Sequence, residues 1–536
     1  MLIGLAVLVN CTGLLLPVLG PDGTLYAAIS KEMVLRSDYL NLYAEGSDWL
    51  DKPHFQFWIT ALFFKIFGVS AFSYKLPALL FVFMGAAYVY LFAEKLYSRK
   101  VATWSVIILL TAQHLIMSNN DVRAEPYLVG LIIASVYHFY LAYKQSSILH
   151  LLPASFFAAC AVMTKGIFAL IPIYGAVFGH LLIIHDYKGL LSFRWLLSFI
   201  LVGIFISPEL YALWHQFDAY PEKTVFGRNN VSGIRFFFWD SQFGRFMNTG
   251  PIKGKGDPTF FIHTTLWAFL PWSILLFAGL IRIIRHFRNL RYYKEWFAFC
   301  GAMSTFILFS LSKFQLPHYI NILFPFFAII TADYLFAINS RRQNLLLPIQ
   351  TTLVVLCLLV PVGLQLVYMP EVSPALYLPV ILMAAITLYS LFNRYGYWKE
   401  RIIQRCALGV LTLNVYLNLV LYPDMMQYQS GNTAARYVNT HFPNVPVVQF
   451  KNRYDNAFHF YSNNPVIAID SLAQLRQLPQ RRVLFIADLR DTTPLPPNDS
   501  ITTIPHYHIS RMTGRFLYHK TRDEELSEYI LRMKKQ

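Results

Sequence analysis

The sequence predicts an α-helical protein that crosses a membrane many times and carries a small mixed α/β domain at its C-terminal end. Three observations predict this class. Of the 536 residues, 56% are hydrophobic and only 14% are charged. The mean hydropathy is +0.44, which together with this composition is typical of membrane proteins. Apolar runs of the length that spans a bilayer, about 17 to 25 residues, also recur along the chain.

About thirteen such runs are expected to be membrane spans. The first carries no charged side chain, and because it lacks a basic leader and an A-x-A-like site, we expect it to remain as an anchor. The two runs beside Lys165 are short and meet at a charge. The predicted spans are Met1–Leu19, Leu76–Phe92, Val101–Met117, Tyr127–Tyr143, Leu149–Met163, Ile167–Ile184, Trp195–Trp214, Ile262–Ile281, Phe297–Leu311, Ile320–Ala337, Leu345–Tyr368, Ala375–Phe392 and Ala407–Tyr422.

The positions of the basic residues explain the formal charge of +16. We expect no binding of nucleic acid. Many basic residues lie in short loops between spans, where the positive-inside rule predicts the cytoplasmic side. The N-terminus is then inside and, with an odd number of spans, the C-terminus is outside. These loops contain Arg99 and Lys100, Arg282 to Lys294, Arg341 and Arg342, and Arg394 to Arg405. The five cysteines lie in apolar runs without metal-ligand or disulfide spacing.

Residues 1–422 are expected to form the membrane domain, with two long outer segments. In residues 20–75, Tyr26–Leu35 and Phe55–Phe67 show helical periodicity but are too short or too polar to span, which predicts helices lying in the membrane surface. Residues 215–261 are predicted to be a flexible outer loop. Residues 423–536 are predicted to form the outer α/β domain, with strands Val445–Phe450, Val483–Ile486 and Ile501–Ile504 and helices Asn432–His441 and Asp523–Met533.

The first outer segment contains the candidate catalytic acid. Asp22 follows the first span and has glycines and a proline around it. The alternative is that Asp22 only caps a helix beginning near Thr24. A carboxylate in a water-poor pocket beside the membrane is suited to act as general base toward a hydroxyl group of a lipid-borne substrate.

A second acid and a cation follow in Asp51-Lys52-Pro53. Lys52 is predicted to bind a phosphate, while Asp51 orients it or binds a divalent metal. An ordinary surface ion pair before a proline-initiated helix is the alternative.

Three other outer segments add candidates for the same cavity. Asp121, Arg123 and Glu125 stand close together at the end of a span, where Arg123 is expected to pair with both acids, although caps and snorkelling charges also occur there. Lys313 and His318 end a later span. In the long loop, Lys253 and Lys255 alternate with glycines, which suggests an anion-binding lid or an ordinary loop.

The chain resembles the membrane glycosyltransferases of GT-C fold, closest to the branch of the aminoarabinose lipid A transferases and protein O-mannosyltransferases (glycosyltransferase families 39 and 83). The resemblance rests on Asp22 to Ala27, on Asp51-Lys52-Pro53 with Phe57-Trp58, and on the run Phe67 to Pro77. It implies that Asp22 activates the acceptor and that Lys52 binds the phosphate of a polyprenyl-phosphate sugar. Arg245, in a His-x-x-Arg-Phe-like element, would be a second phosphate ligand, with Lys253 and Lys255 nearby.

The resemblance implies an inverting transferase in the bacterial inner membrane, monomeric, with its site and C-terminal domain facing the periplasm. Its acceptor would be an envelope lipid such as lipid A, a glycan or a protein. Some positions depart from that branch. This chain has Gly23 and Asp51 where the branch has glutamates, and Gln242 and Lys255 where the branch has histidines. These departures argue against the zinc ion and the lipid A acceptor of that branch.

Two other functional classes remain open from the sequence. A transporter or flippase for an anionic lipid would use the outer cations to bind cargo, but such proteins favour repeated halves and charges near the bilayer midplane. A structural assembly subunit would not need an acid beside several cations. No nucleotide-binding or hydrolase motif is present.

Overall fold

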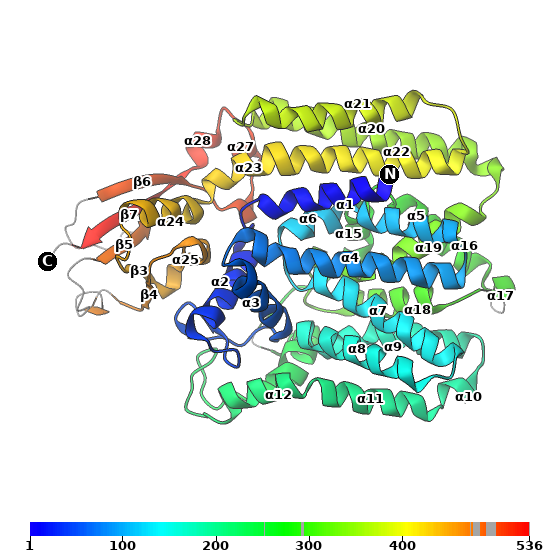
Figure 1. Cartoon of the computed structure of the whole chain (residues 1–536), viewed down its shortest axis with the longest axis horizontal. Helices are drawn as coiled ribbons and strands as arrows, with labels where there is room; N and C mark the ends of the chain where they lie inside the picture. Colours follow the sequence, from blue (N-terminus) through cyan, green and yellow to red (C-terminus); the bar gives the residue numbers. More distant parts are fainter. Residues whose placement is uncertain (251, 291–293, 472, 475–482, 489–499, 535–536) are drawn as a thin grey trace.

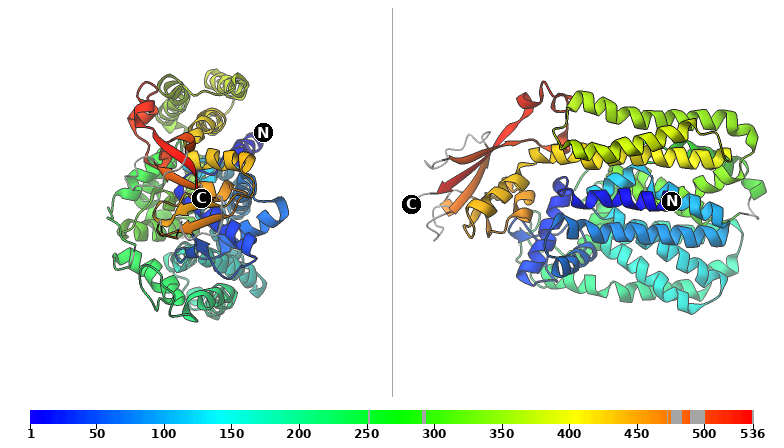
Figure 2. Two further views of the ribbon diagram at one scale, coloured as in Figure 1. Left: turned by 90° about the vertical axis from the view of Figure 1, so that its left-hand side faces the viewer. Right: turned by 45° about the horizontal axis from the view of Figure 1, so that its top comes forward.

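The structure is a computed structural model that describes residues 1–250, 252–290, 294–471, 473–474, 483–488 and 500–534. Long helices run side by side in a bundle, and a sheet domain extends beyond one end of it (Figures 1 and 2). The helices α2 and α3 lie at that same end, whereas α17 lies at the opposite end (Figure 1).

The predicted class is confirmed, but the predicted number of spans is not. Among the described residues, eight helical segments have the length and composition of a span: Ala71–Leu96, Glu125–Lys144, Ile148–Lys165, Tyr187–Phe205, Pro317–Ala337, Ser340–Tyr368, Pro374–Phe392 and Trp398–Tyr428. The pair α5 (Arg99–Leu110) and α6 (Gln113–Asn120), bent by 50°, gives a ninth if it is counted as one span.

The four remaining predicted spans form helices that are shorter than these segments. Three are the helices α1 (Leu2–Thr12), α9 (Leu170–Ile183) and α18 (Phe297–Leu311). The run predicted at Ile262–Ile281 is divided between α15 (Phe260–Ala268) and α16 (Ser273–Arg285). Pro271 lies in the break, where its missing N–H prevents one continuous helix. Hydropathy alone does not detect such breaks.

The remaining helices of the bundle are mostly apolar along their length. Their bounds are α4 (Ala71–Leu96), α7 (Glu125–Lys144), α8 (Leu151–Lys165), α10 (Tyr187–Leu190), α11 (Phe193–Phe205), α12 (Ser207–Leu213), α17 (Phe287–Leu290), α19 (Phe324–Ala337), α20 (Gln343–Tyr368), α21 (Tyr377–Phe392) and α22 (Trp398–Tyr416). The helix α7 is buried along most of its length and packs against α4 and α8. It therefore forms the centre of the core.

The first outer segment forms two helices, as predicted. They are α2 (Pro21–Arg36) and α3 (Phe55–Phe67), joined by a segment with the hairpin β1 (Tyr43–Ala44) and β2 (Ser47–Asp48). Tyr26, Trp49 and Phe57 meet edge to face, with ring centroids 5.6 to 6.1 Å apart. Such aromatic contacts hold the two helices and their connection as one unit.

The long outer loop has more helical structure than predicted. It contains the π-helical turns η4 (Trp214–Asp218) and η5 (Phe236–Gly244) with the short helices α13 (Gly233–Arg235) and α14 (Arg245–Met247). Phe168 packs edge to face against Phe243 and Phe246 of this segment. Arg245 is thus carried on a helical turn packed against the bundle rather than on an open loop.

The C-terminal domain is a five-stranded sheet of order β4-β3-β5-β7-β6 with helices beside it. Strand β3 is parallel to β4 and β5, whereas β7 is antiparallel to β5 and β6. The strands are β3 (Val447–Phe450), β4 (Val466–Ile469), β5 (Val483–Asp488), β6 (Ser500–His506) and β7 (Ser527–Lys534). The helices are α23 (Tyr422–Met425), α24 (Ser430–His441), α25 (Asn456–Tyr461), α27 (Gly514–Leu517) and α28 (Arg522–Glu525).

The predicted helix Asp523–Met533 is wrong. Only its acidic start forms the single turn α28, and the rest is the strand β7, which lies between β5 and β6. The apolar run of Tyr529, Ile530 and Leu531 fits either a helix or a strand locally. The strand is stabilised by pairing with β5 on one side and β6 on the other. No local sequence pattern reveals this pairing. The other predicted helix and strands of this domain are confirmed.

The C-terminal domain docks onto α2 and the end of the first helix. The buried Lys31 of α2 donates to the carbonyl oxygens of His459 and Ser462, at 2.7 and 2.6 Å. The Tyr461 hydroxyl accepts a hydrogen bond from the backbone N–H of Val18 at 2.8 Å. These contacts connect the outer domain directly to the segment that precedes Asp22.

Candidate active site

The position of Asp22 is determined by the turn between α1 and α2. Lys75 of α4 is fully buried and donates to the carbonyls of Gly13, Leu16 and Pro17, at 3.0 to 3.1 Å, so that it satisfies the end of the first helix. Gly20 then adopts φ +71°, a conformation that favours glycine. The helix α2 starts at Pro21, and Asp22 makes no side-chain cap bond. The predicted alternative, a helix cap near Thr24, is therefore not observed.

Arg123 connects Asp22 to a second acid. Its guanidinium donates to Asp22 Oδ2 at 2.7 Å and lies 2.9 Å from Asp121 Oδ2. Burial acts to lower the pKa of Arg123, but Asp121 and Asp22 beside it raise that pKa above the ordinary value. Burial raises the pKa of Asp121, against the opposing effect of Arg123. Arg123 pairs with two acids as predicted, but the second acid is Asp22 and not Glu125.

Gly23 explains how Asp121 approaches the start of α2. A Cβ atom at Gly23 would lie 3.1 Å from Asp121 Oδ1, and one at Gly20 would lie 3.2 Å from the same atom. Both contacts are tighter than ordinary packing. A side chain at position 23, where the resemblance implies a glutamate, would require the Asp121 carboxylate to shift by a few tenths of an ångström. In this chain the second carboxylate beside Asp22 therefore comes from Asp121.

Lys52 and Arg245 share the carboxylate of Asp51. Lys52 Nζ is 2.7 Å from Asp51 Oδ2, and Arg245 contacts Oδ1. Burial lowers the pKa of Lys52, against the effect of Asp51. Burial acts to raise the pKa of Asp51, but Lys52 and Arg245 hold it below its usual value. Because the Lys52 and Asp51 side chains are only 17% and 23% exposed, they do not form the ordinary surface ion pair considered above.

His54 fixes the backbone that carries Lys52. It is completely buried; its backbone N–H and Nδ1 contact the two carboxylate oxygens of Glu209 in α12, at 2.9 and 3.0 Å. Its Nε2 lies 3.1 Å from the carbonyl of Leu40. The helix α3 begins just afterwards, at Phe55. A pair buried this well holds residues 51–54 in one conformation.

Glu125 forms the floor of the same region. Its side chain is 2% exposed and pairs with Lys165, while His318 Nε2 lies 3.8 Å from Oε1. The Lys165 ammonium is 3.7 Å from the centre of the Tyr319 ring, a cation–π distance. Sequence reasoning missed Lys165 and Tyr319 as site residues. For Lys165 a signal was present, because a charge between two apolar runs is a recognised functional signal, but it was interpreted only as a break between spans.

Most of the charged groups described above line one cavity of about 180 Å³. Its walls include Asp22, Lys52, Asp51, Arg123, Glu125, Lys165, Arg245, His318 and Tyr319. A second cavity of about 80 Å³ shares Lys52, Lys165, Arg245 and Tyr319 but continues along apolar side chains such as Phe168, Phe246 and Phe309. The cations therefore lie at the border between a polar space and an apolar one.

Four predicted residues lie outside both cavities. Asp121 lines neither of them, although it pairs with Arg123. Lys253, Lys255 and Lys313 are exposed and line neither of them. Gly254 and Gly256 bring the loop backbone against residues 312–314, where a Cβ atom would meet main-chain atoms at 2.2 to 2.8 Å. The glycines thus allow close packing of the loop. A phosphate contact by its lysines stays a prediction.

The acids do not form a metal site by themselves. Among the described residues, no group of three or more His, Cys, Asp or Glu side chains is arranged to hold a metal ion. Asp51, the candidate metal ligand, already has one carboxylate oxygen against Lys52 and the other against Arg245. The donor set around Asp51 therefore fits an ion-pair network and not the coordination of a divalent cation.

Comparison with known proteins gives the family context. Residues 51–212 match the family described as dolichyl-phosphate-mannose-protein mannosyltransferase. An uncharacterized protein of Aquifex aeolicus is 29% identical over 346 residues, which are 63% of this chain and 64% of that protein. The undecaprenyl phosphate-alpha-4-amino-4-deoxy-L-arabinose arabinosyl transferase of Wigglesworthia glossinidia brevipalpis is 25% identical, over 62% of this chain and 57% of that protein. The chain thus spans less than two thirds of these two curated relatives.

A further relative and a solved structure extend this likeness. The arabinosyl transferase of the same description from Edwardsiella ictaluri is 27% identical over 73% of this chain and 71% of its own length. The crystal structure of ArnT from Cupriavidus metallidurans bound to undecaprenyl phosphate matches with a TM-score of 0.73 and 17% identity. It covers 91% of this chain and 92% of that one. The resemblance inferred from the sequence is confirmed, and the chain has the GT-C fold of these multi-pass membrane proteins.

Proposed function

We propose that this chain is a glycosyltransferase that transfers a sugar from a polyprenyl-phosphate carrier to a hydroxyl group of an envelope acceptor. The observation that carries the proposal is that Asp22, Lys52 and Arg245 line one cavity although they lie far apart in the sequence. An acid beside several cations, at the end of a membrane bundle, has the charges that such a transfer needs. The named arabinosyl transferases among its relatives support the same class.

The donor phosphate is bound by the cations at the border of the two cavities. Lys52, Arg245 and Lys165 face both spaces, so a phosphate there meets positive charge while its prenyl chain follows the phenylalanines. Burial strengthens these charge interactions because water does not screen them. In the free protein Asp51 and Glu125 neutralise the cations, and the incoming phosphate competes with them.

Asp22 acts as the general base. The acceptor hydroxyl oxygen attacks the anomeric carbon and passes its proton to the Asp22 carboxylate as the new C–O bond forms. The bond between the anomeric carbon and the phosphate oxygen breaks, and its electron pair leaves with the polyprenyl phosphate. Lys52 and Arg245 neutralise the charge that develops on that group. A single displacement of this kind inverts the configuration at the anomeric carbon.

A transporter or flippase is the competing class. Such proteins place their binding charges near the bilayer midplane between repeated halves. Here Asp22, Arg123 and Lys52 line one cavity. The helices α2 and α3 of the first outer segment and the C-terminal domain lie at one end of the bundle (Figure 1). This placement favours chemistry at a membrane face over passage through it.

The location follows from charge asymmetry. The loops rich in arginine and lysine, including those at Arg99 and Arg341, are predicted to be cytoplasmic by the positive-inside rule. The helix α2, whose first turn contains Asp22, and the C-terminal domain lie at the opposite end of the bundle from α17 (Figure 1). In a bacterial inner membrane this end faces the periplasm, where lipid-linked sugars and envelope acceptors meet. We propose that orientation, and we propose a monomer as the working unit.

The experiment is a transfer assay with purified protein. Radiolabelled undecaprenyl-phosphate sugars and envelope fractions from a Gram-negative bacterium are incubated with the wild type and with Asp22→Asn. Label that moves to the envelope fraction only with the wild type supports the proposal. Label that moves with neither protein, while the carrier is carried across proteoliposomes, supports a flippase and contradicts it.

A further inference from the structure

The two proposed phosphate ligands come from segments that are distant in the sequence. Lys52 lies in the first outer segment, whereas Arg245 begins α14 in the long outer loop. Both cations contact the carboxylate of Asp51. The incoming phosphate competes with that carboxylate, so Asp51 does not hold the two cations together once the donor is bound. Another part of the chain has to set their positions.

One short element holds the segment that carries Lys52. It consists of α12 and the π-helical turn η4, and it covers residues 207–218. The carboxylate of Glu209 in α12 accepts the backbone N–H of His54 at 2.9 Å, and its other oxygen lies 3.0 Å from the Nδ1 atom of His54. Both side chains are completely buried. Because His54 follows Lys52 by two residues, these two contacts fix the backbone direction at Lys52.

The same element binds this segment a second time, through Gln216. Its Oε1 atom accepts the backbone N–H of Leu42 at 2.9 Å, and its Nε2 atom donates to the carbonyl oxygen of Leu42 at 2.8 Å. Gln216 thus makes the two hydrogen bonds that a neighbouring β-strand would make. Its Nε2 atom also donates to Asp48 Oδ1 at 2.9 Å, and the side chain is completely buried. A buried amide that uses all of these bonds specifies one position for the segment.

The other end of the element holds the helix that carries Arg245. Asp218, the last residue of η4, accepts hydrogen bonds from the backbone N–H groups of Gly233 at 3.0 Å and Ile234 at 3.3 Å. These N–H groups belong to the start of α13, which Asp218 therefore fixes. Gly233 permits the approach, since a Cβ atom there would lie 3.0 Å from the Leu213 carbonyl oxygen. From α13 the chain continues through η5 into α14 without a break, to Arg245.

We propose that Glu209, Gln216 and Asp218 are positioning residues that set Lys52 against Arg245, so that both cations reach the donor phosphate. The inference rests on the proposed function and adds residues that line neither of the two cavities. Ligand groups that are held in place before the phosphate arrives bind it more tightly, because less order has to be created on binding. The element provides this order from behind the cations.

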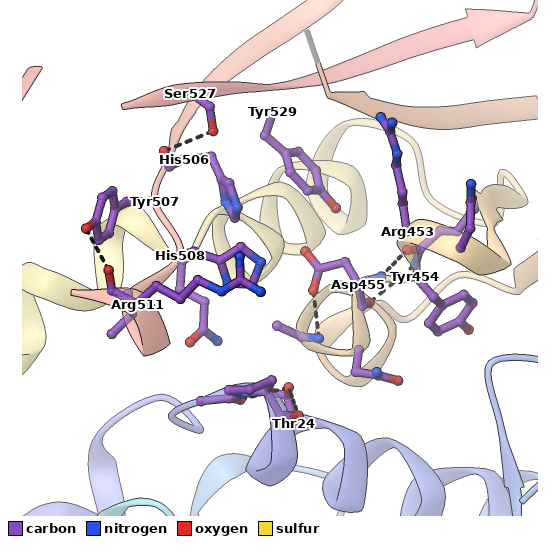
Figure 3. A pocket seen from close by; sticks show the side chains of 18 of the residues that line it. Thr24, Arg453, Tyr454, Asp455, His506, Tyr507, His508, Arg511, Ser527 and Tyr529 are labelled. Atoms are coloured by element: carbon purple, nitrogen blue, oxygen red, sulfur yellow. Dashed lines mark hydrogen bonds between the residues drawn. The ribbon is translucent and has the colours of Figure 1, made fainter. Parts of the chain in front are cut away.

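The element is separate from the space between α2 and the C-terminal domain. A cavity of about 750 Å³ lies there, with Thr24 of α2 on one side and Asp455 and His506 of the outer domain on the other (Figure 3). Acids as well as cations line that cavity, and none of residues 207–218 is among its described lining residues. Substitutions in the element should therefore change the binding of the lipid-linked donor and leave this second space as it is.

Binding of radiolabelled undecaprenyl phosphate to the detergent-solubilised full-length protein tests the inference without catalysis. Glu209→Ala, Gln216→Ala and Asp218→Ala should each weaken binding about tenfold, since a misplaced cation loses part of a charge-assisted hydrogen bond. Glu209→Gln should bind as the wild type does, because its oxygen accepts the His54 N–H and its NH2 group donates to Nδ1 when the ring proton is on Nε2. Asp218→Asn should do the same, since asparagine replaces aspartate well at a helix start.

The matched control removes a buried polar side chain from α22, which carries neither cation. Arg405 donates to the carbonyl oxygens of Ser390, Leu391 and Asn393 at 2.9 to 3.0 Å. It lines none of the cavities described above. Arg405→Met should lower the Tm and leave the affinity for undecaprenyl phosphate unchanged. If it weakened binding as much as Glu209→Ala does, loss of stability would explain both variants and the inference would be wrong.

Double variants show whether each residue acts through its own cation. Glu209→Ala should add little to the loss caused by Lys52→Ala but should keep its full effect beside Arg245→Ala, because non-additive effects identify residues that act together. Asp218→Ala should show the reverse pattern. Additive losses in all four double variants would overturn the inference, since a purely structural role does not distinguish the two cations.

The outcomes also separate this inference from the proposed function. Wild-type affinity in Glu209→Ala and Asp218→Ala contradicts the inference and leaves the glycosyltransferase standing. Absence of undecaprenyl phosphate binding by the wild type contradicts both. Binding that follows the expected pattern without any transfer contradicts the glycosyltransferase and supports the positioning role. In the transfer assay, Glu209→Ala should raise the KM for the polyprenyl-phosphate sugar and leave the KM for the envelope acceptor unchanged, whereas equal changes in both would contradict the inference.

Discussion

Arg123 donates to the Asp22 carboxylate at 2.7 Å while it also contacts Asp121. The planar guanidinium, with donors in a fixed geometry, therefore orients the proposed base. Because the Oδ1 atom of Asp121 is buried without a hydrogen-bond partner among the described residues, the contact of Arg123 with Oδ2 also provides the charge that Asp121 needs.

Arg123→Lys should lower kcat strongly while changing the Tm only slightly. A lysine keeps the charge but cannot hold both carboxylates in one plane. Misplacing a catalytic group by about 1 Å costs on the order of 10²-fold in rate, and we expect a loss of that size with a small change in Tm. An unchanged kcat would show that Arg123 is only an ion-pair partner. Steady-state transfer rates and thermal unfolding in detergent give the two readings.

Lys52→Ala and Arg245→Ala should each reduce transfer by on the order of 10²-fold or more, by analogy with the loss of one oxyanion donor. The loss should appear mainly in kcat/KM for the lipid-linked donor. Arg228→Ala, on the same outer loop but exposed and outside both cavities, is the matched control and should keep wild-type kinetics. Equal losses in all three variants would indicate general electrostatic attraction instead of a phosphate site.

Glu125→Gln should destabilise the protein. The substitution keeps the shape of the side chain but removes the charge that pairs with Lys165. Leaving one partner of a buried ion pair uncompensated costs about 3 to 5 kcal/mol, so Tm should fall clearly. Glu222→Gln, an exposed glutamate without a described ion pair, should not change Tm. A stable Glu125→Gln protein would mean that Lys165 is neutral or finds another partner.

The junction between α2 and the outer domain should weaken in acid. Burial acts to raise the pKa of Glu32, but His459 and Arg36 lower it to about 2. The folded pKa is below the unfolded one, so the stabilisation is fully present above about pH 4.5 and is lost as the pH falls toward 2. Glu32→Gln should show a flatter fall of Tm across this range. Parallel Tm curves for the wild type and the variant would argue against this linkage.

Much of this site was predictable from local signals. An acid at the end of the first apolar run predicted Asp22, and an acid-Lys-Pro step in the same outer segment predicted Lys52. Helical periodicity predicted the regions of α2 and α3. These local patterns were informative because each depends on a few neighbouring residues and on the boundary between apolar and polar sequence.

The parts that failed depend on contacts between distant segments. Arg123 was expected to pair with Glu125, two residues away. In the fold Arg123 pairs with Asp22 instead, and Glu125 pairs with Lys165. The strand β7 resembles a helix locally and becomes a strand because β5 and β6 pair with it. Gly23 was read as a departure from the family pattern. Its reason, the approach of Asp121, needs the tertiary structure.

The most direct test of the account is single-turnover transfer by Asp22→Asn with the donor already bound. The amide keeps the size of the side chain but cannot accept the acceptor proton, so the account predicts donor binding and Tm like those of the wild type with no detectable glycosyl transfer. Transfer at the wild-type rate by this variant would show that Asp22 is not the base and would contradict the proposed mechanism.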